Sequence, residues 1–576
     1  MLAAIIIAAL ALPSGYVPDA ECTSCHSGIA RSYQNVGMSR SFYRPRPETN
    51  IEDFDAPPFH HEKSKQWMEL KWRDGKLVFR RWTDPSTVFE QPVDWILGSG
   101  NHARTYLYAT PSGELFQLPI AWYTQTKSWG MAPGYDRADH EGVLRRVRHE
   151  CMFCHNAYAG VAENTSDGYW RDQSFPAHLP EGIGCQRCHG PGAEHVRRAN
   201  ESAAVARATI VRPTRLDAKK RNDVCYECHM QASVAIAGVR RFGRDITSFR
   251  PGQPLGDYLL HTDISENDLP RTDRFEINHH PYRLEQSRCF RESKGRLSCL
   301  SCHDPHRKLV VADVRVVCRN CHLRRRDAAG PAAETAALHV SADTDCVSCH
   351  MPKRRTQDVV RVVMTDHRIQ IKPSGDLVAP REERETHVSD VTFLDRDVKD
   401  AEIYRVIAIL RAHGGRHAAS LQRLETLLAT TKPKEIEPYL DLASGQLIQK
   451  RYADLEKTAR SILERAPQHP LALEWLGVAR IAHGHRDEGL ALLRGLTRPE
   501  ARFNLALLLR EPSEAIAQLE LVVKERPNLA AAWFYLGENS AALGDRERAM
   551  ECYRRALSID PNFVRAANAL ASLQAR

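Results

Sequence analysis

Alternating apolar and polar positions in the first quarter of the chain predict antiparallel strands. The stretch 66–82 alternates on both sides of Asp74-Gly75, a dipeptide that tolerates the positive φ angles of a tight turn. A second hairpin is predicted over 105–123, with its turn at Pro111-Ser112-Gly113. We therefore expect a small β-rich insertion at about 50–135, for which a scaffold is the simpler role and substrate binding is the alternative.

The last third of the chain has a helical period and an internal repeat. Its apolar residues recur as in tetratricopeptide units, each of which is a helix-turn-helix of about 34 residues. Four units are visible, a degenerate unit around 403–433 precedes them, one unit is shortened near 498–501, and 563–574 is expected to close the array. We predict an α-solenoid over 398–576 whose concave face docks a protein or peptide, with stabilisation or dimerisation as the alternative role. The clearest unit carries Trp533, Leu536, Gly537, Ala549, Tyr553, Ala556 and Pro561.

Two shorter stretches have distinct compositions. Residues 370–397 are polar and charged, so we expect a linker there. The apolar run from Leu2 to Leu12 is too short to span a bilayer but is typical of a secretion signal, and Ala9-Leu10-Ala11 offers a cleavage site, although no Lys or Arg precedes the run. We predict a signal peptide at 1–15, no integral membrane segment, and a periplasmic or extracellular protein.

Seven copies of Cys-x-x-Cys-His are the most specific feature of the sequence. In this signature of c-type haem, two thiols form thioethers with the porphyrin and the adjacent His becomes the proximal iron ligand. Zinc is the alternative, but a zinc site joins such pairs two by two, whereas here an odd number of pairs each carries its own His. We expect seven covalently attached haems c, bound by Cys22, Cys25, Cys151, Cys154, Cys185, Cys188, Cys225, Cys228, Cys299, Cys302, Cys318, Cys321, Cys346 and Cys349 and ligated by His26, His155, His189, His229, His303, His322 and His350.

The expected haems change what the cysteine count and the net charge of the chain imply. Only Cys289 and Cys552 lie outside the motifs, so a disulfide framework is not expected. The formal charge of +8 would suggest an acidic partner or nucleic acid, but two propionates on each of seven haems turn it to about −6. We predict no nucleic-acid binding, redox proteins as partners, and a mainly α chain with an irregular, haem-packed heptahaem cytochrome domain over 16–369.

The second axial ligand of each iron separates electron carriers from enzymes. A second His or Met closes the iron, whereas an open position lets a small molecule bind. His195 and His306 follow motifs closely enough to bind a neighbouring haem, and His367 follows the last motif. Glycines before His102 would let the backbone approach a porphyrin, and Met38 is an alternative ligand for the first haem.

The stretches 184–195 and 302–306 resemble the multihaem cytochromes typified by the tetrahaem carrier that accepts electrons from hydroxylamine oxidoreductase. Exported bacterial multihaem proteins fused to tetratricopeptide repeats are similar over nearly the whole chain, including Cys151-Met152-Phe153-Cys154-His155-Asn156 and Cys349-His350-Met351-Pro352. The resemblance implies mostly bis-histidine haems packed in near contact. It adds three histidines as distal ligands, namely His61, His140 and His279.

These features together favour an exported electron carrier that connects redox partners. An oxidoreductase acting on a small nitrogen or sulfur compound at one five-coordinate haem is the first alternative, and a haem-bearing scaffold subunit of a respiratory complex is the second. The chain lacks the Cys-x-x-Cys-Lys motif of multihaem nitrite reductases and has seven motifs where hydroxylamine oxidoreductases carry eight haems. Both departures favour the carrier, and we assign no catalytic residue.

Overall fold

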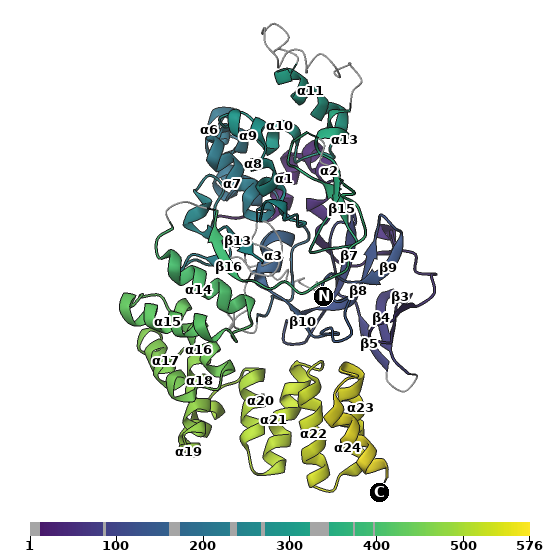
Figure 1. Ribbon diagram of the computed structural model, residues 1–576, viewed down its shortest axis with the longest axis vertical. Coiled ribbons are helices and arrows are strands. Elements are labelled where there is room, and N and C mark those ends of the chain that lie inside the picture. Colours follow the sequence, from purple (N-terminus) through teal and green to yellow (C-terminus); the bar gives the residue numbers. More distant parts are fainter. Residues whose placement is uncertain are drawn as a thin grey trace, which may run out of the picture.

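The chain folds into a motif-bearing region of short helices, a pair of β-sheets and a helical array. In Figure 1 the motif region lies at the top, the sheets at the right and the array along the bottom. None of the described helices combines the length and the hydrophobicity that crossing a bilayer requires. Most of the expected signal peptide lies outside the described residues, because the computed structural model describes residues 12–84, 88–160, 173–230, 239–266, 271–322, 345–371, 375–394 and 398–575.

Two antiparallel sheets make up the β-rich part. The smaller sheet has the strand order β2 (Phe59–His61), β3 (Gln66–Arg73), β4 (Lys76–Trp82) and β5 (Val88–Pro92). The larger sheet has the order β1 (Phe42–Tyr43), β6 (Trp95–Leu97), β7 (Ala103–Ala109), β8 (Leu115–Tyr123) and β10 (Arg145–Val147), and β9 (Ser128–Met131) also pairs with β8. Because β1 and β10 are its edge strands, the β-structure extends beyond the expected 50–135 on both sides.

Both predicted hairpins are confirmed. Asp74 and Gly75 have φ angles of 47° and 74° in the turn between β3 and β4. Positive φ at both turn residues matches the twist of the flanking strands, which is why Asp-Gly is favoured there. The second hairpin closes where Ala109 pairs with Leu115, and Gly113 in its turn has a φ of +83°.

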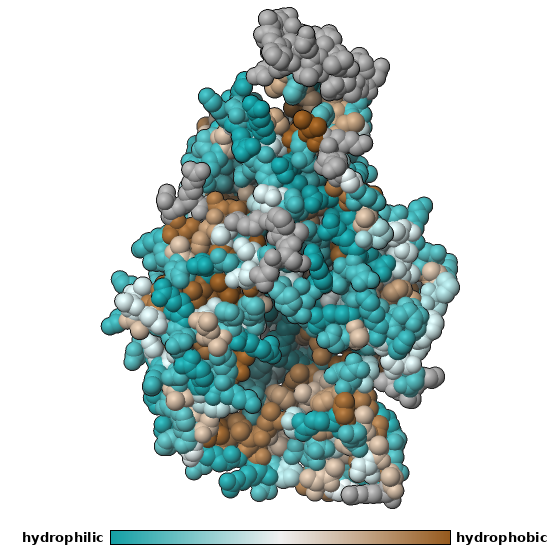
Figure 2. Space-filling model, viewed as in Figure 1, coloured by the Kyte–Doolittle hydropathy of each residue, from teal (hydrophilic) through white to brown (hydrophobic). Residues whose placement is uncertain are grey.

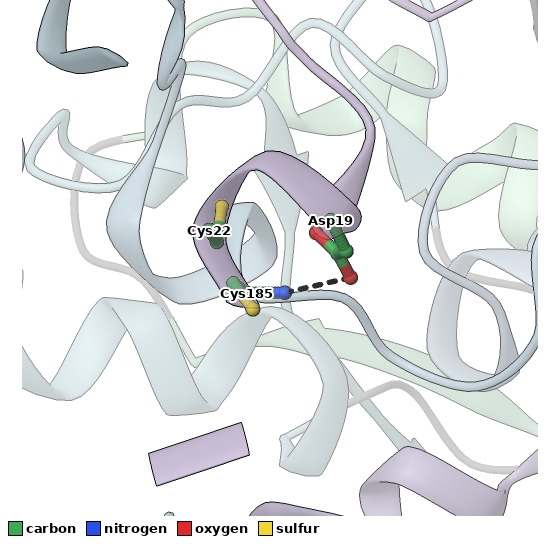
Figure 3. A group of neighbouring side chains, drawn as sticks. All are labelled: Asp19, Cys22 and Cys185. Atoms are coloured by element: carbon green, nitrogen blue, oxygen red, sulfur yellow. Dashed lines mark hydrogen bonds between the residues drawn. The ribbon is translucent and has the colours of Figure 1, made fainter. Parts of the chain in front are cut away.

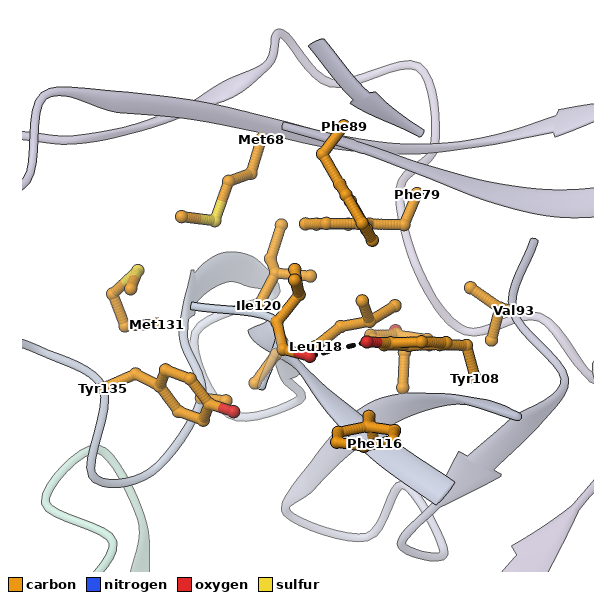
Figure 4. Close-up of a cluster of buried hydrophobic side chains, with 14 of the residues drawn as sticks. Met68, Phe79, Phe89, Val93, Tyr108, Phe116, Leu118, Ile120, Met131 and Tyr135 are labelled. Carbon is orange, nitrogen blue, oxygen red and sulfur yellow. Dashed lines mark hydrogen bonds between the residues drawn. The ribbon is translucent and has the colours of Figure 1, made fainter. Parts of the chain in front are cut away.

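The apolar side chains of the two sheets form one core between them. Figure 4 shows Met68, Phe79 and Phe89 of the smaller sheet directed toward Tyr108 and Leu118 of the larger one. All five are almost fully removed from solvent. Burial of each such side chain contributes about 1.5–3 kcal/mol, so the alternation read from the sequence supplies the driving force for packing these sheets together.

The motif region contains short helices, as expected, and each motif lies at the end of one. A helix places the two cysteines, three residues apart, on the same face. The motif helices are α1 (Asp19–Cys25), α3 (His149–His155), α4 (Gln186–His189), α7 (Ala218–His229), α10 (Cys299–Cys302), α11 (Val311–His322) and α13 (Cys346–His350). Between them lie α2 (Ser27–Tyr33), α5 (Ala193–Arg198), α6 (Ala203–Ala208), α8 (His280–Glu285) and α9 (Arg288–Glu292), with the 3₁₀ turns η1 (Met38–Arg40), η2 (Pro47–Thr49), η3 (Pro213–Arg215), η4 (Leu255–Asp257) and η5 (Arg271–Asp273).

Residues 375–394, within the stretch expected as a linker, contact both the motif region and the β-rich part. Strand β16 (Asp390–Phe393) pairs with β13 (Thr262–Ser265), and Glu383 accepts hydrogen bonds from the backbone N–H groups of Gly134 and Asp136. The backbone and Glu383 therefore hold this connector to the fold, while the side chains of Arg381, Glu382, Arg384 and Glu385 are exposed. Two further two-stranded sheets join β11 (Val239–Arg240) to β12 (Leu259–Leu260) and β14 (Lys353–Arg355) to β15 (Val363–Thr365).

The helical array consists of five consecutive helix pairs and a closing helix, so the degenerate unit around 403–433 is a full pair. Gly537 lies where two helices of one unit meet, and a Cβ there would approach the Tyr553 ring to 2.6 Å. The closeness of this contact explains the glycine of the repeat pattern. The helices are α14 (Ala401–Ala412), α15 (Ala418–Thr431), α16 (Glu437–Ile448), α17 (Tyr452–Arg465), α18 (Pro470–Ala482), α19 (Arg486–Arg494), α20 (Pro499–Leu508), α21 (Pro512–Glu525), α22 (Ala530–Ala542), α23 (Arg546–Ile559) and α24 (Val564–Gln574).

The array contacts the rest of the molecule at both of its ends. At the first end, the Phe242 ring stacks on Tyr404 of α14 with ring centres 4.2 Å apart. At the other end, the buried Arg81 of β4 donates hydrogen bonds to the carbonyl oxygens of Ser558 and Ile559 at 2.7 and 2.9 Å. The repeat array is therefore part of one packed unit with the motif region and the sheets (Figure 1).

A buried charge network joins the second hairpin to the array. Glu114 on the hairpin contacts Arg526, which follows α21, and Arg526 also contacts Glu500 of α20. The side chains of Glu114 and Arg526 are 1% and 3% exposed. Burial lowers the pKa of Arg526 to about 10, and Glu114 opposes that effect. Glu114 and Arg526, together called the buried joint below, therefore compensate each other's charge in place of water.

Replacing Glu114 by Gln should lower the free energy of unfolding by about 3 kcal/mol, because the buried Arg526 loses one of its two carboxylate partners. Urea denaturation followed by circular dichroism measures the change. The matched control is Glu141→Gln, which removes an exposed ion pair with Arg145 and should cost about 0.5 kcal/mol or less. Equal losses in the two variants would contradict a stabilising role for the buried joint.

Candidate haem-binding site

The first and third motifs lie against each other. Figure 3 shows Cys22, Cys185 and Asp19, whose ligand atoms all lie within 4.8 Å of one another. An Asp19 carboxylate oxygen accepts a hydrogen bond from the Cys185 backbone N–H at 3.3 Å. A metal ion could be held by such a group, but both cysteines belong to complete motifs with their own histidine. The arrangement therefore fits two adjacent haem attachment points better than a separate metal site.

The spacer residues of the second, third and fourth motifs meet in the interior. Arg187 of the third motif forms a buried ion pair with Glu227 of the fourth at 2.9 Å, and both side chains are at most 5% exposed. The Arg187 guanidinium also lies 4.4 Å from the ring centre of Phe153, a spacer residue of the second motif, and donates to the Cys228 sulfur at 3.7 Å. One arginine thus holds three motifs together.

The remaining motifs continue the series. The Cys225 and Cys299 thiols hydrogen-bond to each other, which joins the fourth motif to the fifth and raises the pKa of Cys225. Helix α10 of the fifth motif packs on α11 of the sixth, and α11 packs on α13 of the seventh. Burial and the nearby Cys346 raise the pKa of Cys318 to about 11. These contacts connect the seven motifs in one series, and none of the sixteen cysteines forms a disulfide.

Four motif histidines have a second imidazole facing them. Two imidazoles on opposite sides of one metal have ring centres about 6 Å apart, because each metal–nitrogen bond is about 2 Å long and each ring centre lies roughly 1 Å further out. The observed ring planes differ by only 14° to 22°. The pairs are His26 with His195 at 6.4 Å, His189 with His306 at 5.9 Å, His229 with His280 at 6.2 Å and His303 with His367 at 6.2 Å.

Backbone carbonyl groups orient several of these rings. In His189, His195 and His367 the Nδ1 atom lies 2.8 to 3.1 Å from a carbonyl oxygen, and the same holds for His350 and the Gln370 carbonyl at 2.8 Å. An Nδ1–H donated to a carbonyl leaves Nε2 as the free ligand atom. Burial lowers the pKa of His189 and lowers that of His367 to about 4, so both rings are neutral at pH 7, the form that binds metal.

Apolar side chains lie beside two of the motifs. Beside the second motif they line a small cavity of about 30 Å³, with Phe153, Phe249 and Leu259 and also Arg240 in its lining. Near the sixth motif, Leu309 and Val316 are 49% and 53% exposed. Figure 2 shows hydrophobic surface at this upper end of the molecule. Exposed apolar side chains beside an attachment motif fit a macrocycle that would cover them.

The structure brings His195, His306 and His367, each expected from the sequence as a distal ligand, to motif histidines. At the fourth motif, His280 rather than the expected His279 faces His229. The His279 ring contacts Tyr282, and its Nε2 lies 3.5 Å from Glu276. The sequence shows two adjacent histidines, His279 and His280, but not which of them faces His229. The direction of each ring depends on where α8 begins, and the sequence does not fix that residue.

His61 and His140, expected as distal ligands, lie against each other in the β-rich part. Their ring centres are 5.6 Å apart with planes tilted by 56°. Both ring nitrogens of His61 are engaged, with Ser64 at 2.7 Å and Asp136 at 3.2 Å. His140 accepts a hydrogen bond from the Gly142 N–H. The folding of the hairpins directs both rings into a polar cluster of their own, away from the motif histidines.

Three motif histidines lack a facing ring in the described part of the chain. Among the ring contacts of the described residues, none brings a second imidazole to His155, His322 or His350. His102, the remaining expected ligand, precedes β7, and its buried Nδ1 has no hydrogen-bond partner in the structure. His195 occupies the position opposite His26 for which Met38 was the alternative.

The chain is similar to proteins of two kinds. A model of the tetratricopeptide repeat matches residues 530–563. The multiheme cytochrome MtrA of Shewanella baltica (strain OS185) is 24% identical over 190 residues, which cover 31% of this chain and 53% of that protein. This chain thus matches about half the length of that curated relative.

Solved structures that are similar to part of this chain include MamA and two proteins described as TPR proteins. MamA is 20% identical with a TM-score of 0.22, covering 23% of this chain and 83% of that one. YrrB, described as a TPR protein with an unusual peptide-binding site, is 20% identical with a TM-score of 0.24, covering 28% and 87%. A thermophilic TPR protein of Thermus thermophilus is 20% identical with a TM-score of 0.26, covering 31% and 100%. The C-terminal part therefore contains tetratricopeptide repeats, and the chain has a partial similarity to a multihaem cytochrome.

Replacing His280 by Ala should convert one low-spin haem into a high-spin haem, whereas replacing its neighbour His279 by Ala should leave the spin states unchanged. The reason is that only His280 faces a motif histidine. Low-temperature EPR of the oxidised protein, with a pyridine haemochrome count for each variant, measures the effect. The opposite pattern would restore His279 as the ligand.

The stability of the folded chain should fall as the pH decreases from 6.5 to 4, in part through His140. Burial and the nearby His61 lower the pKa of His140 from 6.5 to about 4. In this range the unfolded chain binds a proton that the folded chain does not, so stability increases with pH. Thermal unfolding at pH 7 and pH 5 should show a smaller difference for His140→Gln than for the unchanged protein. His485→Gln, at an exposed histidine, is the control and should not reduce the difference.

Proposed function

We propose that this chain is an exported multihaem c-type cytochrome that transfers electrons between redox proteins, and that its repeat array docks a protein or peptide. The observation that carries the proposal is the connected series of seven motifs, in which four motif histidines have a facing imidazole. The partial similarity to a multiheme cytochrome supports it. Attachment of haem c takes place outside the cytoplasmic membrane, which is consistent with a periplasmic or extracellular location.

Bound haem would supply reversible one-electron chemistry at its iron. The residues of the chain hold and tune that group. Cysteines of each motif would form the thioethers, and the backbone carbonyl groups on Nδ1 keep the Nε2 atoms of His189 and His367 directed inward. The Arg187–Glu227 pair fixes the third motif relative to the fourth. Motifs that touch one another favour electron transfer through the whole series.

The two ends of the molecule suggest two kinds of partner. The sixth and seventh motifs, on α11 and α13, lie at the top of Figure 1, and helices α20 to α24 of the array lie at the bottom. Cys321, His322 and Cys349 of the upper motifs are exposed. We infer that a redox partner exchanges electrons at the upper end, while the array binds a different protein or peptide.

A second candidate function is an oxidoreductase of a small nitrogen or sulfur compound. The observation that favours it is the lack of a facing imidazole at His155, His322 and His350 in the described part of the chain. One of these positions left open would let such a compound reach the iron. A scaffold subunit of a respiratory complex is a third candidate, which is favoured by the packing of the array onto the motif region.

Protein purified from an exporting host should contain about seven haems per chain in the pyridine haemochrome assay and show at least four low-spin ferric haems by EPR, since four motif histidines have a facing ring. A high-spin signal that changes on addition of nitrite, hydroxylamine or sulfite would favour the oxidoreductase. Variants with Ser in place of both cysteines of one motif should lose one haem each and serve as the control for the count. Protein that is exported and folded but free of haem would refute the proposal.

A further inference from the structure

A short segment after the seventh motif, residues 366–370, touches ligand residues of three motifs. His367 within it faces His303 of the fifth motif. The carbonyl oxygen of Gln370 lies 2.8 Å from Nδ1 of His350, the histidine of the seventh motif. The backbone N–H of Ile369 donates to the Ser287 hydroxyl at 2.8 Å, which ties the segment to the chain just beyond α8. Helix α8 carries His280, the ring that faces the fourth motif.

Within this segment Asp366 forms a two-point ion pair with Arg283 of α8. The Arg283 Nε and Nη2 atoms donate to the two Asp366 carboxylate oxygens at 2.9 and 2.7 Å. The two side chains are 0% and 1% exposed, so the pair is fully shielded from solvent. Arg283 also donates to the carbonyl oxygen of Thr272 at 2.5 Å. Two parallel charge-assisted hydrogen bonds fix the relative orientation of the two segments as well as their distance.

Each member of the pair lies close in sequence to a facing imidazole. Asp366 immediately precedes His367, and Arg283 follows His280 by three residues, which is about one helical turn. The rings of His280 and His367 are in contact, with centres 4.4 Å apart and planes inclined by 31°. The ion pair and the ring contact therefore connect the same two segments at two points.

We propose that Arg283 and Asp366 are positioning residues that together hold His280 and His367 as axial ligands of the fourth and fifth haems. This inference rests on the proposed haem-binding function. A His280 or His367 ring could rotate or withdraw if its segment moved, because the position of each imidazole follows that of the segment that carries it. The buried pair prevents that movement, and its loss should affect the two haems together rather than one.

A substitution at Asp366 tests the pair more directly than one at Arg283, because Arg354 also lies beside Asp366. Its guanidinium lies 3.5 Å from Asp366, so a second cation is available to the carboxylate if Arg283 is altered. Removing the carboxylate removes both contacts at once. Asp366→Asn keeps the shape of the side chain and its ability to accept a hydrogen bond, but it leaves Arg283 without its charged partner.

The experiment compares the holoprotein with its Asp366→Asn variant by low-temperature EPR and pyridine haemochrome count. The expected result is an unchanged haem count with a new high-spin signal equivalent to about one to two haems per chain, because the thioethers remain while axial ligands are lost. Arg283→Lys is the second variant, which keeps a positive charge but cannot form two parallel hydrogen bonds, and it should give a smaller change of the same kind.

Asp441→Asn is the matched control. Asp441 also forms a buried two-point pair, with Arg411 at 2.7 and 2.8 Å, but it lies in the repeat array away from the motifs. It should lower the thermal unfolding temperature without changing the EPR spectrum. If Asp366→Asn and Arg283→Lys behave like this control, the pair is merely structural and the inference is overturned. If the unchanged protein itself holds no haem, the proposed function fails and this inference fails with it.

Discussion

A haem iron with two axial imidazoles would need a second imidazole held about 6 Å from the ring of its motif histidine. The packing of the motif region holds four such rings in place. The facing rings come from separate segments. His195 reaches the first motif and His306 the third, while His280 and His367 reach the fourth and fifth. Short helices and connectors with little secondary structure are well suited to this task, because each ring can be delivered from a different direction without bending a long element.

Buried charges, rather than a large apolar core, join these segments. Arg187 and Glu227 connect the third motif to the fourth, and Arg283 and Asp366 connect the segments that carry two facing rings. Such pairs contribute little net stability because both charges must be desolvated, but they penalise any arrangement that separates them. A region built around large cofactors has little side-chain core of its own, so geometric specificity from ion pairs suits it. The sheets and the repeats, which each have an apolar core, hold the region from two sides.

The repeat array packs against the rest of the molecule at both of its ends. Phe242 stacks on α14 at one end, and Arg81 together with the Glu114–Arg526 joint engages the other end. A partner bound to the array would therefore contact an element that is packed against the motif region.

The features that depend on neighbours in sequence could be predicted from the chain alone. Motif spacing predicts the attachment cysteines and proximal histidines, and these stay predictions. The Asp74-Gly75 dipeptide predicted a hairpin and a repeat of about 34 residues predicted the solenoid, and both are present in the structure. Each is a local pattern, because thioether formation, turn geometry and helix pairing are set by residues close together. Facing imidazoles are different, since they meet a motif from up to about 170 residues away, as His195 meets His26. Which histidine faces a motif depends on the direction of its ring. The His280 ring points toward a motif histidine whereas the His279 ring does not, and the His61 ring points into a polar cluster. Only the tertiary packing decides these directions.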